Sequence, residues 1–305
     1  MTKITAAAVQ VGSRLFDLPA TLALFETKLS EVASLGADLA VFPEAFLGGY
    51  PKGIDFGVRV GMRSAEGREQ FRIYFDNALV RESKEVTHIC TLVKDANVNV
   101  VLGLIERAGG TLYCVSAVIN RQGKIVAWHR KLMPTAMERV IWGQGDGSTM
   151  DVAQTDIGVV STAICWENYM PLYRSHLYAQ GTQIHCAPTV DDRDVWRPSM
   201  QMIALEGRCF VVSACQFMQV GDVAASWYDP IQGQSENSVL INGGSCIISP
   251  MGEILAEPIF GNEAILMAEL DMDDITRGKF DLDLAGHYAR PDVFQLNVNT
   301  APYTT

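Results

Sequence analysis

The regular alternation of strand-like and helix-like segments is the feature that most constrains the fold of this 305-residue chain. Apolar runs rich in β-branched residues are separated by stretches with the 3.6-residue spacing of amphipathic helices. A chain with this order buries its strands in sheets and covers the outer faces of the sheets with helices, which is an α/β architecture. Several strands are also joined by short turns, so we expect mixed rather than purely parallel sheets.

The expected elements follow one another without a long interruption. Because no linker rich in Pro, Gly or Ser divides the sequence, we expect one domain over residues 1–305, in which about the last 30 residues form a C-terminal extension. The turns AGG and RQG are expected to join three strands as hairpins. The expected strands lie at 3–11, 37–44, 98–107, 111–120, 124–132, 182–190 and in the run that ends at Cys165, and the expected helices at about 19–35, 66–96, 197–208 and from about 171.

Composition and charge argue against several classes of partner. The formal net charge is −11, whereas a nucleic-acid-binding face must be basic. No run of about 18 apolar residues is free of charges, so no membrane span is expected, and the apolar run that ends at Gly12 is too short for a signal sequence. The seven cysteines form no C-x-x-C pair, which favours free thiols in a reducing compartment. We therefore expect a cytoplasmic protein.

The segment TAMERVIWGQGDGS, residues 135–148, contains three alternating glycines: Gly143, Gly145 and Gly147. The alternation superficially resembles a phosphate-binding loop, but the GK[ST] ending is absent and no clear helix start follows the last glycine. We therefore expect a tight loop in which the glycines adopt positive φ angles.

Three reactive side chains follow strands at the point where the chain leaves the sheet. Glu44 ends LAVFPE, Lys131 ends IVAWHRK, and Cys165 ends VVSTAIC. Substrates of α/β proteins bind beyond the carboxyl ends of strands, so these positions are candidates for catalysis. Taken singly, a Glu or Lys at such a position is usually a solvated charge, and a Cys is usually a small buried hydrophobe. Together, the three residues point to a nucleophilic site.

The three groups could perform one coherent reaction. A free thiol has a pKa of about 8.5 and is a weak nucleophile until it loses its proton. A carboxylate such as Glu44 can take that proton, and an ammonium such as Lys131 favours the thiolate and negative charge on the substrate. The backbone N–H of Trp166, on the turn after the nucleophile, could donate a further hydrogen bond to a developing anion.

Other thiol chemistries are less well supported by the sequence. A Cys–His hydrolase needs a histidine partner; His129 should share the strand face of Lys131, where it could equally be a supporting polar group. His176, His185 and Cys186 lack zinc-type spacing, so no metal site is expected. The pattern alone leaves a non-catalytic assembly protein open.

At these residues the sequence resembles a known family. The segments FPEAFLGGYPKG, HRKLMPTAMERVIWGQGDGS and CWENYMPLYR are similar to the three signature stretches of nitrilases, a branch of the carbon–nitrogen hydrolase superfamily. RPSMQMIALEGRCFVVSACQF and GHYARPD extend the resemblance over nearly the whole chain. It implies a four-layer α-β-β-α sandwich with two mixed sheets and outer helices. It also implies a homodimer or a larger homo-oligomer, including spirals.

The resemblance also implies residue roles and a reaction. It makes Glu44 the general base, Lys131 the electrophilic stabiliser and Cys165 the nucleophile. Glu138 matches a second glutamate that positions the lysine and the attacking water. A small nitrile would be converted to a carboxylic acid and ammonia through a covalent thioimidate and a thioester, without a metal or organic cofactor. An amidase or carbamoyl-type hydrolase on the same fold is the alternative.

A nitrile is small and nearly apolar, so its pocket should have aromatic and aliphatic walls with few polar groups. Four residues lie on or just after the candidate strand ends and are expected to form these walls: Tyr50, Trp166, Thr189 and Trp196. Each of them could instead be an ordinary packing residue. Aliphatic, aromatic and arylacetonitrile substrates are all compatible with these residues.

Overall fold

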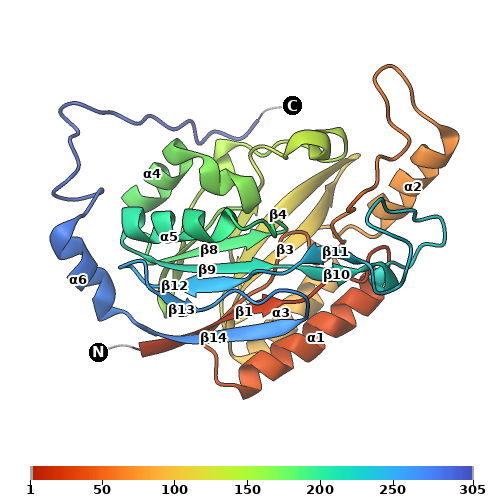
Figure 1. Cartoon of the computed structure of the whole chain (residues 1–305). Helices are drawn as coiled ribbons and strands as arrows, with labels where there is room; N and C mark the ends of the chain where they lie inside the picture. Colours follow the sequence, from red (N-terminus) through yellow and green to blue (C-terminus); the bar gives the residue numbers. More distant parts are fainter. Residues whose placement is uncertain (1–2, 304–305) are drawn as a thin grey trace.

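Two six-stranded sheets pack face to face between helical layers in the computed structural model, which describes residues 3–303 (Figure 1). The first sheet has the strand order β14-β1-β2-β3-β4-β5, and the second has the order β13-β12-β9-β8-β7-β6. Both sheets contain parallel and antiparallel pairs. The architecture is the four-layer α-β-β-α sandwich with mixed sheets that the sequence and its resemblance predict.

The first sheet is built largely from the first half of the chain. Its parallel centre, β1-β2-β3, continues through two antiparallel hairpins into β4 and β5, as the turns AGG and RQG predict. Strand β14 comes from late in the sequence and pairs antiparallel with β1 along eight residues. The strands are β1 (Lys3–Gln10), β2 (Leu39–Val41), β3 (Asn99–Ala108), β4 (Thr111–Ile119), β5 (Ile125–Arg130) and β14 (Ala264–Asp271).

The second sheet has a parallel centre of three strands, β7, β8 and β9, flanked by antiparallel strands. A small separate sheet pairs β10 with β11. The strands are β6 (Ala153–Thr155), β7 (Gly158–Thr162), β8 (Ile184–Thr189), β9 (Phe210–Cys215), β10 (Phe217–Gln219), β11 (Val239–Asn242), β12 (Cys246–Ile248) and β13 (Ile254–Ala256).

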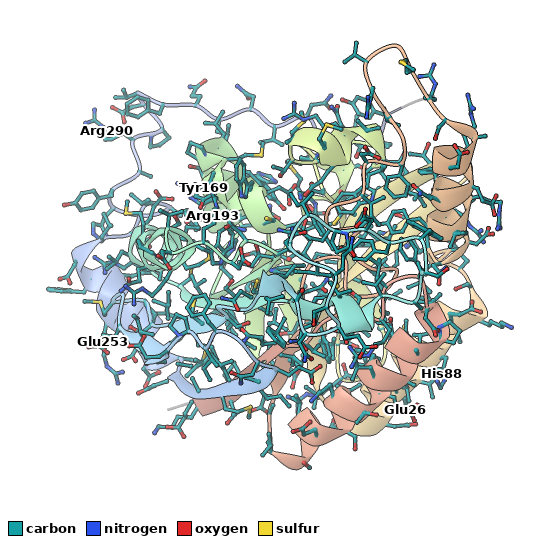
Figure 2. All side chains as sticks on the ribbon, turned by 45° about the vertical axis from the view of Figure 1, so that its right-hand side comes forward. Glu26, His88, Tyr169, Arg193, Glu253 and Arg290 are labelled. Carbon is teal, nitrogen blue, oxygen red and sulfur yellow. The ribbon has the colours of Figure 1, made fainter. Side chains whose placement is uncertain are left out.

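The helices form the two outer layers. On the first sheet lie α1 (Leu18–Ser34) and α3 (Lys84–Ala96), whose apolar residues join the core under that sheet. Their outer faces carry exposed polar side chains such as Glu26 and His88 (Figure 2). On the second sheet lie α4 (Pro171–Ala179) and α5 (Trp196–Gly207). Two further helices are α2 (Ala65–Asp76) and α6 (Asp273–Asp281).

The expected single helix over 66–96 is wrong, because the chain forms two helices with a non-helical connection. Asn77 ends α2, and the Ser83 side chain caps the start of α3. Between them, Leu79 donates its N–H to Ile105 and accepts one from Arg107, so the connection follows the edge of β3. Pairing with a strand replaces the helical hydrogen bonds at this point.

The space between the sheets is filled by small and β-branched side chains. Ala6 and Ala8 of β1 face Val212 and Ala214 of β9 within one buried cluster. Alanines on facing strands allow the two sheets to approach closely, and burial of such apolar surface is the main contribution to stability. The strand ends that carry the candidate residues are therefore held on a rigid double sheet.

The expectation of positive φ angles at Gly143, Gly145 and Gly147 is wrong, because none of them is among the positive-φ residues. They are needed for close approach instead. A Cβ on Gly145 would lie 2.1 Å from the carbonyl oxygen of Arg130, and one on Gly147 would lie 2.0 Å from that of Asn299. The loop is thus pressed between β5 and the C-terminal segment.

Residues 282–303 contain no regular helix or strand and run back along the surface past α4 (Figure 1). The N–H of Tyr303 donates to Asp146, so the segment is fixed beside the glycine loop. The division into one domain and a C-terminal extension remains a prediction. Among residues 3–303, no helix has the combination of length and apolar character that a bilayer crossing requires.

Candidate active site

The structure brings together the three strand-end residues that the sequence singles out. Glu44 follows β2, Lys131 follows β5, and Cys165 begins the short 3-10 helix Cys165–Tyr169 after β7. Lys131 Nζ donates to Glu44 Oε1 at 2.6 Å and to Glu138 Oε2 at 2.8 Å. The side chains of these three residues and of Cys165 are all buried. Glu44, Lys131 and Glu138 are called the charge cluster below.

Glu138 is held on both sides of its carboxylate. It lies in the 3-10 helix Ala136–Val140, where its Oε2 also accepts the N–H of Thr135 at 2.6 Å. Its Oε1 accepts the hydroxyl of Tyr50 at 2.9 Å. Three donors of different kinds therefore fix one carboxylate next to Lys131, which restricts both its position and that of the ammonium.

The backbone around the site adopts conformations that non-glycine residues seldom take. Ala45, Ala136 and Cys165 have φ angles of 51°, 47° and 51°. Ala45 directly follows Glu44, Ala136 lies two residues before Glu138, and Cys165 is itself a residue of the site. Glu44 in addition lies so close to β3 that a Cβ on Gly103 would be 2.0 Å from the carbonyl oxygen of Pro43. The reactive groups are thus placed by a tightly constrained backbone.

Burial and charge set the protonation states of the site. Burial raises the pKa of Glu44 to about 7, although Lys131 lowers it. Burial also raises the pKa of the Cys165 thiol, and the charge of Glu44 raises it further. Burial lowers the pKa of Lys131, but Glu44, Cys165 and Glu138 outweigh that effect and raise it well above its usual value. At neutral pH the site holds an ammonium, a neutral thiol and a carboxyl that titrates near neutrality.

One oxygen of Glu44 is left free for chemistry. Glu44 Oε2 is buried and has no hydrogen-bond partner among the atoms of residues 3–303. The Cys165 thiol lies close enough to Glu44 to lower the pKa of this carboxyl. A buried acceptor without a partner is costly, and one with a neighbouring thiol is suited to receive its proton.

A cavity of about 170 Å³ opens at Cys165. The hydroxyl of Thr189 donates to the Cys165 sulfur at 3.2 Å and accepts the N–H of Asp191 at 2.9 Å. Tyr50 and Trp166, two of the expected wall residues, line this cavity, and Thr189 contacts the nucleophile from the side. The lining residues are Tyr50, Lys52, Thr135, Glu138, Cys165, Trp166, Val190, Asp191, Asp192 and Arg193.

The two tryptophans expected as pocket walls lie in different environments. Trp166 is 43% exposed; its indole N–H donates to Asp191, and the Arg193 guanidinium lies 4.8 Å from the centre of its ring. Trp196 is only 2% exposed, donates to Ser213 and packs in the core under α5. Trp196 does not line the Cys165 cavity, so its side chain is a packing residue at the start of α5.

Glu167 connects the two segments that carry the nucleophile and the lysine. Its Oε1 accepts the N–H of Leu132 at 2.6 Å, and its Oε2 accepts the N–H of Ile164 at 2.7 Å. Leu132 follows Lys131, and Ile164 precedes Cys165. A single buried carboxylate thus holds together the backbones next to both reactive side chains.

His129 supports Glu167 from behind. Its Nε2 lies 3.0 Å from both Glu167 oxygens, and its Nδ1 lies 3.0 Å from the carbonyl oxygen of Thr149. Because both nitrogens face acceptors, the ring carries two protons. Burial lowers the pKa of His129, but Glu167 outweighs this and raises it, so the pair is an ion pair. The predicted supporting role of His129 therefore has a structural counterpart, which acts through Glu167.

Asn168 also stabilises the turn that carries Cys165. Its amide donates to the carbonyl oxygens of Ala163 at 2.9 Å and Cys165 at 2.8 Å. Its own oxygen accepts from His185, whose pKa burial lowers to about 4, so that this ring is neutral. Glu167 and Asn168 lie in the segment CWENYMPLYR, but the sequence alone assigns no role to either residue. The available signal was an acid and an amide directly after a candidate nucleophile.

The other cysteines behave as expected for small apolar side chains. All seven are free thiols, and only Cys90 is not fully buried. Cys114 Sγ lies 3.8 Å from Glu44 Oε1, so a second thiol borders the charge cluster. Within residues 3–303, no group of three or more His, Cys, Asp or Glu side chains is arranged to hold a metal ion.

Comparison with known proteins agrees with this geometry. The carbon–nitrogen hydrolase family matches residues 5–280. A nitrilase from Bradyrhizobium diazoefficiens is 53% identical over 90% of this chain and 85% of its own length. A bifunctional nitrilase/nitrile hydratase from Lupinus angustifolius is 49% identical over 98% and 87%. The crystal structure of a nitrilase-superfamily member from Saccharomyces cerevisiae shares the fold, with a TM-score of 0.72 at 21% identity over 94% of this chain and 97% of that one. The chain therefore belongs to the carbon–nitrogen hydrolase family, within its nitrilase branch.

Proposed function

We propose that this protein hydrolyses an organic nitrile to a carboxylic acid and ammonia through a covalent bond to Cys165. The observation that carries the proposal is the buried charge cluster beside a neutral thiol. It combines a proton acceptor that titrates near pH 7, an ammonium and a nucleophile in one buried site. The nitrilase names of relatives at about half identity support the choice of substrate.

In the first step, Glu44 takes the thiol proton, and the sulfur adds to the nitrile carbon. One π bond of the C≡N group breaks and its electron pair moves to the nitrogen, which then receives the thiol proton from Glu44, so that a neutral thioimidate forms and Glu44 is again a carboxylate. Lys131 stabilises the charge that develops on this nitrogen, because its ammonium is already held in place by two carboxylates. Burial strengthens that interaction, since little water screens it.

In the second step, a water adds to the thioimidate carbon with Glu44 or Glu138 as the base. The tetrahedral species carries an amine and the Cys165 sulfur on one carbon. Protonation of the amine expels ammonia and leaves a thioester, and a second water then releases the acid and restores the thiol. One nitrile and two waters give one acid and one ammonia, so no oxidant or cofactor is needed.

The same tetrahedral species could release an amide if the thiol left first. The name of the Lupinus relative couples nitrilase and nitrile hydratase, so both outcomes must be weighed. Two carboxylates at the site stabilise a positively charged leaving amine, which favours ammonia. A difference of about 1.4 kcal/mol between the two barriers gives a tenfold preference. We expect acid as the main product and amide as a minor one.

The test is a panel of nitriles and their matching amides, with ammonia measured and products identified. Nitriles should yield acid and ammonia, and the amides should be hydrolysed poorly. Rapid hydrolysis of amides without action on any nitrile would instead assign an amidase on the same fold.

We further propose that the protein forms a homodimer or a larger homo-oligomer through the layer of α4 and α5. Leu172 on α4 is 69% exposed and Met202 on α5 is 56% exposed, in helices that otherwise cover the second sheet. Burying such side chains against a second copy would remove apolar surface from water. Light scattering after size-exclusion chromatography tests this, and a monomer at micromolar concentration would contradict it. The free thiols favour a cytoplasmic location.

A further inference from the structure

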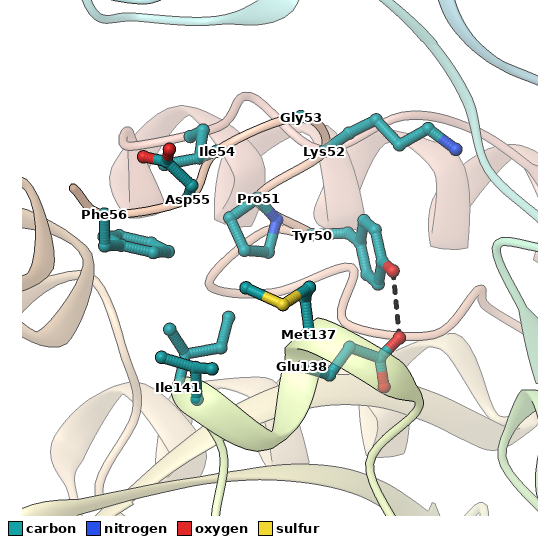
Figure 3. Close-up of a pocket in the computed structure, with 11 residues that line it drawn as sticks. Tyr50, Pro51, Lys52, Gly53, Ile54, Asp55, Phe56, Met137, Glu138 and Ile141 are labelled. Carbon is teal, nitrogen blue, oxygen red and sulfur yellow. Dashed lines mark hydrogen bonds between the residues drawn. The ribbon is translucent and has the colours of Figure 1, made fainter. Parts of the chain in front are cut away.

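An apolar trough begins beside the nucleophile cavity. Its first part is a cavity of about 290 Å³ between the segment 50–56 and the 3-10 helix that carries Glu138 (Figure 3). Its second part, of about 310 Å³, continues towards α2. The trough is defined here by the apolar residues that line these two parts: Pro51, Ile54, Phe56, Val58, Phe71, Met137, Val140 and Ile141.

Shared residues join the trough to the site of chemistry. Tyr50, Lys52 and Glu138 line both the Cys165 cavity and the first part of the trough. Val140 and Ile141 line both parts of the trough. The hydrogen bond from the Tyr50 hydroxyl to Glu138 marks the junction between the reactive and the apolar regions (Figure 3).

Five charged residues also line the trough: Lys52, Asp55, Arg63, Arg68 and Glu138. Glu138 is held by Tyr50, Lys131 and Thr135, and the side chains of Arg63 and Arg68 are exposed to solvent. Figure 3 shows Pro51, Phe56, Met137 and Ile141 around one space, whereas the Lys52 side chain extends away from it. Asp55 accepts the N–H of Gly57 and so is directed to its own backbone. A charged group placed among the apolar residues of the first part would lose some of its hydration, which is costly.

We propose that the trough binds the organic arm of the substrate and selects nitriles with an extended apolar substituent, alkyl or arylalkyl, over short or charged ones. The inference rests on the proposed function. A bound nitrile has its carbon at the Cys165 sulfur, so an arm longer than a few atoms must leave the 170 Å³ cavity. The trough adjoins that cavity and has a mostly apolar lining, and its first part has the size of the smallest common ligand sites.

The experiment measures kcat/KM for linear nitriles from propionitrile to hexanenitrile, together with a nitrile of equal length that ends in a carboxylate. Each buried methylene should raise kcat/KM about fourfold. Val140→Asn should lower kcat/KM for hexanenitrile about fivefold more than for propionitrile, because it makes the wall of the trough polar. Val140 is 47% exposed, so the substitution spares the core.

Val293→Asn is the matched control, since Val293 is 54% exposed and lies in the C-terminal segment, outside both parts of the trough. Val293→Asn should leave kcat/KM unchanged for both propionitrile and hexanenitrile. If propionitrile is turned over well but kcat/KM does not change with chain length, the proposed role of the trough is wrong and the nitrilase proposal still stands. A higher kcat/KM for the carboxylate-ended nitrile than for the alkyl nitrile of equal length would contradict the preference for apolar substituents. No turnover of any nitrile by the unmodified protein would overturn the proposed function and this inference together.

Discussion

The charge cluster and the trough border the same cavity but are built in opposite ways. The charge cluster is fully enclosed; every hydrogen bond of Lys131 and Glu138 goes to another fixed group of the protein. The trough is open and apolar, with half-exposed side chains such as Val140 that make no specific polar contact. The first region fixes the positions of its groups through hydrogen bonds, whereas the second offers only shape and hydrophobicity.

This difference separates two properties of an enzyme. Substitutions in the charge cluster should lower kcat for every substrate, because they alter groups that act on the reacting atoms. Substitutions in the trough should change the ratio of kcat/KM between substrates, because they alter contacts with an unreactive arm. Variants in each region can test whether this separation holds.

Cys165→Ala should reduce turnover by more than about four orders of magnitude for short and long nitriles alike, because the covalent step is lost. Cys165→Ser should be nearly as inactive, since a hydroxyl is harder to ionise than a thiol. Steady-state ammonia release measures both. Circular dichroism should show an unchanged fold, and substantial activity in either variant would refute the covalent mechanism.

Lys131→Arg should lower kcat about 1000-fold although the charge is kept. A planar guanidinium is larger than the ammonium and cannot donate to Glu44 and Glu138 from the same point. The loss should be equal for propionitrile and hexanenitrile. Lys3→Arg, at an exposed ion pair with Glu269, is a control that should leave the rate unchanged. A near-normal Lys131→Arg enzyme would show that only charge matters at this position.

Glu167→Gln should lower kcat between about 10- and 100-fold while KM stays within twofold, because the carboxylate positions reactive groups without touching the substrate. An amide cannot accept from both Leu132 and Ile164 through two oxygens, and it no longer neutralises His129. Kinetics below the melting temperature of the variant separate this effect from lost stability. A change confined to KM would mean that Glu167 belongs to the substrate site instead.

The effect on the pH profile is small near pH 7 and grows as the pH falls. Glu44 must be ionised to accept the thiol proton, and burial raises its pKa to about 7. The acid limb of kcat/KM should therefore fall from about pH 7 downwards, approaching a tenfold loss per unit. The acid limb of the kcat/KM profile should have the same midpoint in the Val140→Asn variant, because this substitution lies in the trough. A profile that stays flat down to pH 5 would show that the proton is taken by a group other than Glu44.

Much of the architecture could be predicted from the sequence because it depends on local pattern. The strand–helix alternation, the hairpins and the three strand ends all follow from periodicity and turn residues. Strand β14 was not predicted, since its partner β1 lies more than 250 residues away and pairing at that distance leaves no local signal. The break between α2 and α3 was missed for a related reason: its residues pair with β3.

The site shows the same limit at the level of side chains. The reactive residues could be predicted because each follows a strand, and Glu138 could be assigned only through the family resemblance. The role of Glu167 could not be predicted, because it depends on two backbone N–H groups from segments about 30 residues apart. Trp196 was expected as a wall from its place after β8, but the start of α5 turns its ring into the core.

The pairing of β14 with β1 also dictates when the molecule can become complete. Strand β1 is the second segment from one edge of the first sheet, and its outer edge remains unpaired until residues 264–271 have left the ribosome. At ordinary rates of synthesis, the apolar strand Lys3–Gln10 waits for roughly 13–50 s with a bare edge of hydrogen-bonding groups. Bare edges of this kind recruit other chains. Nascent chains that stop before residue 264 should therefore aggregate, and chaperones that cover strand edges should raise the yield of the full-length protein.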